Sequence, residues 1–219
     1  MKCKNGVELN ISPSTAKGVL RIRVGGENYQ IHQFMSIVIF SFALGLRAEG
    51  KGFVANHNGE VIELDRFRAS TLIREYFTIW SKFYLPKVGL KGATVLDAGA
   101  GCGETTHFFF QHGAARVIAL EKDPNAVSLL RKNSIKNKWR IVIYEDSLQP
   151  WHVKDLKYDF AKIDVEGGER CLLQLENLPF KTVIETHSKE LTQGFMDKFH
   201  MKILKEVRKD KEVCILGSA

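Results

Sequence analysis

A glycine-rich turn behind an acidic residue is the first feature of this sequence that could do chemistry. Residues 97–104 read Asp-Ala-Gly-Ala-Gly-Cys-Gly-Glu and follow an apolar run directly. Glycines at such a turn let the backbone bend tightly and approach a ligand without a Cβ in the way. The spacing is GxGxG, whereas dinucleotide sites use GxGxxG, and Asp97 would repel a pyrophosphate. The turn therefore favours a cofactor that carries positive charge, such as a sulfonium and an ammonium group.

Three further polar positions follow apolar runs. Glu121 comes 20 residues after Gly101, where an acid accepts hydrogen bonds from both ribose hydroxyls of a nucleoside. Asp146 with Ser147 follows the next run, in position to meet an adenine amino group. Asp164 follows the fourth run, beside the expected reacting centre. Each acid could instead only cap a following helix. Together with the turn they predict an S-adenosylmethionine site that consists of Asp97, Ala98, Gly99, Gly101, Gly103, Glu104, Glu121, Lys122, Asp146, Ser147 and Asp164.

Strands and helices alternate from residue 93 onward. Predicted helix starts include Asp123, with Pro124 at the first helical position, and Ser188. A further helix is predicted over residues 169–176. Alternating units predict an α/β fold with a parallel sheet and helices on both faces. Ligands bind at the carboxyl ends of the strands in such sheets, so the acids should meet at one edge. The predicted strands are residues 94–97, 116–121, 141–144, 160–165 and 182–185, followed by a terminal hairpin, 202–207 against 212–216.

The first part of the chain has a different character. Two hairpins are predicted at residues 18–32 and 52–65, and the second turns at Asn58-Gly59. A helix capped by Ser70 follows and ends before Pro86. We therefore predict a β-rich N-terminal extension over 1–68, a candidate substrate cap, and a cofactor-binding domain over 69–219.

Over roughly residues 70–219 the sequence resembles class I methyltransferases, and most closely the FkbM-type family. Three stretches carry the resemblance, and the second matches the KIDVEGxE signature of that family: VLDAGAG at 95–101, KIDVEGGE at 162–169 and IETH at 184–187. The resemblance implies a Rossmann-like, seven-stranded, mostly parallel sheet with an antiparallel last strand. It also implies methyl transfer from S-adenosylmethionine to a hydroxyl of a sugar or small natural product. The chain departs from the family at Gly101 and Cys102, where an asparagine and an isoleucine are common.

Methyl transfer to a hydroxyl requires a base near the acceptor. His187, just beyond the fifth predicted strand, is the first candidate because an imidazole titrates near neutrality. Asp164, Glu166 and Glu185 compete with it as candidates, and His187 could equally begin a helix and bond only to backbone. Asp164, Glu166 and His187 could also hold a divalent metal, since oxygen ligands and imidazole suit Mg²⁺ or Mn²⁺. Their spacing is not diagnostic of a metal site, so we predict no metal.

The formal net charge of +7 keeps RNA open as an alternative acceptor. Residues 131–140 hold five basic residues, no acid and Trp139, a pattern that fits either a phosphate-contacting face with a stacking ring or a solvated helix end. No Asn/Asp-Pro-Pro-Tyr motif follows the fourth strand, which disfavours transfer to a planar nitrogen. A NAD-dependent oxidoreductase is disfavoured by the GxGxG spacing, and a non-catalytic binding module by the intact set of acids.

The compartment is predicted from the cysteines and from hydropathy. Cys3, Cys102, Cys171 and Cys214 form no CxxC pair and no zinc-ligand spacing, which indicates free thiols in a reducing cytoplasm. The most apolar stretch, residues 37–46, has about half of the roughly 20 residues that cross a bilayer. We therefore predict a cytoplasmic protein without a membrane span; the oligomeric state stays open.

Overall fold

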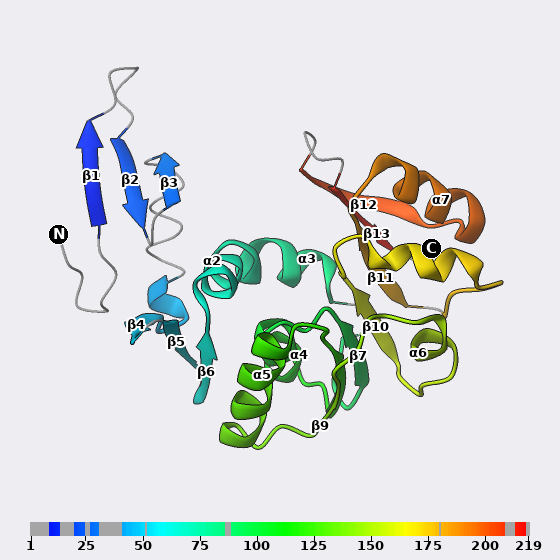
Figure 1. Ribbon diagram of the computed structural model, residues 1–219, viewed down its shortest axis with the longest axis horizontal. Helices are drawn as coiled ribbons and strands as arrows, with labels where there is room; N and C mark the ends of the chain where they lie inside the picture. The colour runs from blue at the N-terminus through cyan, green and yellow to red at the C-terminus, as the bar shows by residue number, and fades with distance from the viewer. Residues whose placement is uncertain are drawn as a thin grey trace. The chain divides into compact units, whose positions relative to one another are not determined.

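The computed structural model describes residues 9–13, 20–24, 27–30, 41–50, 52–85, 89–179, 181–208 and 213–217. The chain divides into two compact units, Met1–Thr78 and Ile79–Ala219. Figure 1 shows their elements in chain order, from blue at the N-terminus to red at the C-terminus.

Short antiparallel strands make up most of the first unit. They form two three-stranded sheets, the first of β1 (Leu9–Pro13), β2 (Leu20–Val24) and β3 (Glu27–Gln30), the second of β4 (Arg47–Glu49), β5 (Gly52–His57) and β6 (Glu60–Leu64). Both predicted hairpins are confirmed, since β2 pairs with β3 and β5 with β6. Asn58 and Gly59 have φ angles of 50° and 83°, as a tight hairpin turn demands. The edge strands β1 and β4 were not predicted because short edge strands have weak local signals.

The helical segment after β6 begins earlier than predicted. Helix α2 (Arg66–Glu75) starts at Asp65, whose carboxylate accepts a hydrogen bond from the Arg68 N–H at 2.8 Å. The predicted cap, Ser70, lies inside the helix, because aspartate is an equally good cap and also complements the helix dipole. The segment continues through a π-helical turn, η1 (Tyr76–Trp80), into α3 (Ser81–Phe83).

One seven-stranded sheet organises the second unit. Its strands are β7 (Thr94–Ala98), β8 (Arg116–Leu120), β9 (Ile141–Tyr144), β10 (Phe160–Ile163), β11 (Thr182–Thr186), β12 (Lys202–Arg208) and β13 (Val213–Gly217), in the order β12-β13-β11-β10-β7-β8-β9. Strands β7 to β11 are parallel and β13 is antiparallel to β11, as predicted. The predicted turn of the terminal hairpin, 209–211, lies outside the described residues. The chain order reverses between β7 and β10, which is where such sheets bind ligands.

Helices flank this sheet. They are α4 (Glu104–Gln111), α5 (Pro124–Lys136), α6 (Pro150–Lys154) and α7 (Lys189–Phe199), with a 3₁₀ segment, η2 (Gly168–Gln174). Asp123 and Ser188 cap α5 and α7 as predicted. The helix predicted at 169–176 is 3₁₀, and the five-residue α6 was missed because it is too short to show a helical period.

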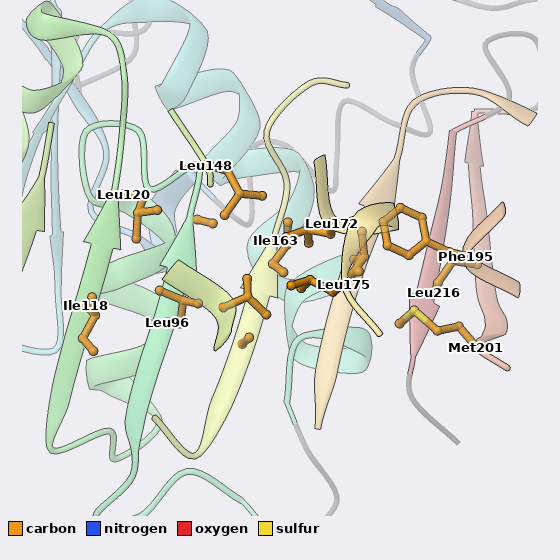
Figure 2. Packing of buried hydrophobic residues seen from close by; sticks show 14 of the residues in the cluster. Leu96, Ile118, Leu120, Leu148, Ile163, Leu172, Leu175, Phe195, Met201 and Leu216 are labelled. Atoms are coloured by element: carbon orange, nitrogen blue, oxygen red, sulfur yellow. The ribbon is translucent and has the colours of Figure 1, made fainter. Parts of the chain in front are cut away.

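Alternation along the strands decides which side chains reach each face of the sheet. Leu96 and Ile163 belong to the apolar cluster drawn in Figure 2, which also includes Leu172 and Phe195. The neighbouring positions in each strand face the other way. There the ring of Phe160 lies 6.1 Å from that of Phe109 in α4. Asp97 and Lys162 belong to this second, α4-covered face.

Within the described ranges, no helix is both long and apolar enough to cross a bilayer. Cys102, Cys171 and Cys214 are free thiols, and Cys3 lies outside the described residues.

Candidate active site

The glycine-rich turn connects β7 to α4 at the carboxyl end of the sheet. Gly99, Gly101 and Gly103 have positive φ angles of 80°, 57° and 96°, a region that side chains disfavour. A Cβ on Gly99 would overlap the carbonyl oxygen of Asp164 at the end of β10. Gly99 is therefore required, because the turn packs directly against the next strand.

Glu121, at the end of β8, contacts this turn. Its Oε2 accepts a hydrogen bond from the Gly101 N–H at 2.8 Å, and its Oε1 accepts one from the Asp123 N–H at 2.9 Å. An ionised carboxylate offers about four lone-pair sites, so these bonds leave capacity for ribose hydroxyls. Lys122, next in the chain, is exposed. The fold thus brings together the turn and the acid that the sequence separates by 20 residues.

Asp97 and Glu104 are buried and bonded within the protein. Asp97 accepts hydrogen bonds from the hydroxyls of Thr105 and Thr106, both at 2.8 Å. Glu104 accepts one from the Cys102 N–H at 2.9 Å. These two acids therefore hold the turn onto α4.

The polar residues after β9 lie at the surface. Asp146 accepts a hydrogen bond from the Ser147 N–H at 2.7 Å, and both side chains are exposed. Nearby rings add an aromatic group that sequence reasoning missed: Trp151 lies 5.9 Å from Tyr144 and 3.8 Å from His152, measured between ring centroids. Trp151 is 42% exposed, which leaves part of its ring open to a planar ligand.

Four carboxylates surround the imidazole of His187 at the carboxyl ends of β10 and β11. Its Nε2 lies 3.5 Å from Asp164, 3.4 Å from Glu166 and 3.9 Å from Glu185. Its Nδ1 lies 3.2 Å from Glu169, which is fully buried. The three residues predicted for catalysis, His187, Asp164 and Glu166, therefore come together. Glu169 is a further member of this cluster that the sequence analysis did not predict. Its position at the end of the signature at 162–169 could have indicated it.

This surrounding changes the protonation of His187. Burial by itself would lower its pKa, but the hydrogen bond to Glu169 and the nearby negative charges outweigh burial and raise the pKa to about 9. The ring is therefore an imidazolium at neutral pH and has no lone pair with which to accept a proton. The expectation of titration near neutrality is corrected, because it considered the histidine without the acids around it.

Lys162 is a fully buried cation beside this cluster, and sequence reasoning missed it as a site residue. Its Nζ donates a hydrogen bond to the Gly99 carbonyl at 2.9 Å and lies 3.5 Å from Asp97 and 3.8 Å from Asp164. Burial alone would lower the pKa of Lys162, but Asp97 and other carboxylates raise it above its ordinary value. The sequence signal that could have indicated Lys162 as a site residue is a single lysine within the otherwise apolar strand 160–163.

Comparison with known proteins identifies the fold. No protein-family model matches the chain. A ribosomal protein L11 methyltransferase of Yersinia pseudotuberculosis is 28% identical over 142 residues, which cover 60% of this chain and 46% of that protein. The chain thus spans about half the length of such relatives.

Two solved structures share the architecture. A 16S rRNA methyltransferase of T. thermophilus, in complex with AdoMet and guanosine, superposes with a TM-score of 0.54 at 18% identity, over 76% of this chain and 49% of that one. A tRNA methyltransferase of M. jannaschii gives 0.53 at 18% identity, over 78% and 56%. The chain has a class I methyltransferase fold. These methyltransferases are named for RNA and ribosomal protein, and none of them is FkbM-type.

In this methyltransferase fold, the basic stretch 131–140 does not present a stacking ring. Trp139 is 9% exposed and stacks on Phe110, with 5.5 Å between ring centroids. The interpretation of Trp139 as an exposed stacking aromatic is therefore wrong. The five basic side chains of the stretch are exposed, and Arg131 pairs with Glu145 at 3.3 Å, as on a solvated helix end.

Proposed function

We propose that the chain is an S-adenosylmethionine-dependent methyltransferase. The observation that carries this proposal is the hydrogen bond from the Gly101 N–H to Glu121. It joins the turn and the acid that would hold one nucleoside cofactor from two sides. The methyltransferase relative and the structure with AdoMet bound support the same activity.

The residues present fit this cofactor. Glu121 would accept hydrogen bonds from the ribose hydroxyls, Asp146 and Ser147 would meet the adenine, and Asp164 would lie near the reacting group. The glycine turn leaves room for the cofactor to approach the backbone closely. The negative charge of carboxylates such as Asp164 complements its sulfonium and ammonium groups. S-adenosylmethionine supplies an activated methyl group when bound. The chain's own task is to hold the acceptor in line and to exclude water.

Replacement of Glu121 tests the cofactor site. Glu121→Gln should weaken the binding of S-adenosylhomocysteine about 10- to 100-fold, since hydrogen bonds to charged groups contribute about 1.5–3 kcal/mol. Isothermal titration calorimetry measures this, with NADH as a second ligand that should not bind. The matched control is Glu176→Gln, which changes an exposed glutamate. Unchanged affinity in Glu121→Gln would remove this residue from the site.

RNA is the acceptor that we propose. Two solved structures of this fold carry names of RNA methyltransferases, 16S rRNA and tRNA. The net charge of +7 favours a polyanionic partner. Neither observation selects the acceptor atom, and the absent Asn/Asp-Pro-Pro-Tyr motif disfavours a planar nitrogen.

Two other acceptors each rest on one observation. A ribosomal-protein side chain is favoured by the L11 methyltransferase match. The stretch at 162–169 favours membership of the FkbM-type family, and with it a hydroxyl of a sugar or small natural product as the acceptor.

Label transfer from methyl-tritiated S-adenosylmethionine distinguishes the three acceptors. Ribosomes and total RNA are incubated with the protein, and the label is then followed through digestion. We expect label that ribonuclease releases and protease does not. Protease-sensitive label would replace RNA by ribosomal protein, and label found only on added sugars would favour the hydroxyl acceptor. The control is a variant that has lost S-adenosylhomocysteine binding.

Proton removal from the acceptor is assigned to a carboxylate. His187 is charged at neutral pH, so Asp164 and Glu166 are the better proton acceptors in the cluster. Their Oδ1 and Oε2 atoms lie 3.5 Å and 3.4 Å from the His187 Nε2, so the imidazolium would orient the carboxylates. The carboxylate that accepts the acceptor's proton becomes a neutral carboxylic acid.

The remaining assignments extend this proposal. Residues 1–68 would form an extension that selects the acceptor, and residues 69–219 the methyltransferase domain. The three free thiols fit a reducing compartment such as the cytoplasm.

A further inference from the structure

The end of the site where the acceptor is proposed to bind carries a negative charge, which repels an RNA. Four carboxylates, those of Asp164, Glu166, Glu169 and Glu185, face the single imidazole of His187. Lys162 lies 3.8 Å from Asp164 but closer to Asp97, at 3.5 Å, and it also donates to the Gly99 carbonyl, so its single charge is shared with Asp97. A polyanion that approaches these carboxylates would be repelled unless another positive charge is present.

Three of these side chains are arranged as ligands of one ion. One oxygen each from Asp164 and Glu185 and one ring nitrogen of His187 all lie within 4.8 Å of one another. The His187 Nε2 is 3.5 Å and 3.9 Å from the two oxygens. Adjacent ligands of an octahedral ion with bonds of about 2.1 Å are about 3 Å apart. Both nitrogen–oxygen distances exceed this spacing by less than about 1 Å, and the two carboxylate oxygens lie within 4.8 Å of each other.

The groups behind these ligands provide an independent indication. Histidines that bind metals usually donate their second ring N–H to a carboxylate, which fixes the ring. The Nδ1 of His187 makes this contact with Glu169 at 3.2 Å, and Glu169 is fully buried. The Tyr84 hydroxyl donates to Glu185 Oε2 at 3.0 Å, so Oε1 is the atom directed toward His187. The contacts of Glu169 and Tyr84 therefore orient the His187 Nε2 and the Glu185 Oε1 toward each other.

We propose that Asp164, Glu185 and His187 bind a divalent cation of the Mg²⁺ or Mn²⁺ kind. Two carboxylates and one neutral imidazole are ligands that Mn²⁺ accepts, and Mg²⁺ and Mn²⁺ keep waters in their remaining positions. Because only the neutral ring binds a metal, the ion would displace the proton that His187 holds in the metal-free chain. With Asp164 bound to the ion, Glu166 remains as the proton acceptor; its side chain is 76% exposed and its Oε2 lies 3.4 Å from the His187 Nε2. The set differs from the one weighed on sequence alone, because Glu185 takes the place of Glu166. The role of this ion rests on the proposed function: the ion would present positive charge to the RNA.

Mn²⁺ alone is the probe for the site itself. The full chain, without cofactor or RNA, is titrated with Mn²⁺ while electron paramagnetic resonance records the free ion. We expect one Mn²⁺ per chain, with affinity reduced at least 10-fold in Glu185→Gln and 10- to 100-fold in Glu169→Gln. The matched control, Glu190→Gln, changes an exposed acid that pairs with Arg170 and should bind as the wild type does. Circular dichroism of each variant establishes that it is folded.

Two outcomes would overturn the site. One is the absence of bound Mn²⁺ up to 1 mM, on the order of the weakest protein sites for hard cations. The other is equal binding by wild type and by folded Glu185→Gln and His187→Gln. Because this measurement contains no acceptor, it stands even where RNA methylation is not found. Where methylation is found, its loss in EDTA and recovery with Mg²⁺ supports the role of the ion, and indifference to EDTA contradicts that role.

Discussion

Replacement of Lys162 by methionine is expected to lower the free energy of unfolding by about 3–5 kcal/mol. Methionine preserves most of the length and apolar contact of the side chain but removes the ammonium. The carboxylate of Asp97, which is fully buried, then loses its cationic partner, Lys162. Removal of one partner of a buried ion pair costs this much because the remaining charge stays desolvated. The carbonyl of Gly99 also loses its donor.

Urea denaturation at neutral pH measures the effect, with Lys154→Met as the control because Lys154 is an exposed lysine of α6. The control should change stability by less than about 0.5 kcal/mol. The double variant Lys162→Met with Asp97→Asn should recover much of the loss, since it removes the stranded charge while the asparagine oxygen still accepts from Thr105 and Thr106. Equal stability of Lys162→Met and wild type would show that the ammonium does not compensate Asp97.

Protonation of His187 is expected to stabilise the fold by about 3 kcal/mol. Its pKa in the folded chain, about 9, lies above the ordinary value of 6.5, and each unit corresponds to about 1.4 kcal/mol. Because the folded state holds the proton more tightly, this contribution is fully present below about pH 6.5. It is lost as the pH rises through about 9.

The measurement compares wild type with His187→Gln in urea between pH 6 and 10, with EDTA present so that no metal replaces the proton. The difference in unfolding free energy should be largest at pH 6 and should shrink by about 3 kcal/mol toward pH 10. Glu169→Gln removes the hydrogen-bond partner of the ring, so its stability should depend less on pH over this range. Parallel curves for wild type and His187→Gln would mean that the acids do not hold the proton.

Much of the methyltransferase fold could be predicted from local patterns. Asp123 with Pro124 and the serine at 188 mark helix starts, and these caps act within one helical turn of the chain. Apolar runs between them placed all five parallel strands. The predictions that failed concern weak or competing local signals. Asp65, and not Ser70, caps α2, and residues 168–174 form a 3₁₀ segment instead of an α-helix.

By itself, the sequence determined the glycine turn, the acid at 121 that follows the next strand, and the alternation of strands and helices that puts both at one edge of a parallel sheet. Their types and spacing along the chain are sufficient, because the backbone of a parallel sheet delivers strand ends to a common place. Only the tertiary structure decided the chemistry of His187. Its four carboxylates come from the ends of β10 and β11, from the turn before η2 and from η2 itself. A pKa depends on distances of a few ångströms and on burial, and sequence spacing contains neither.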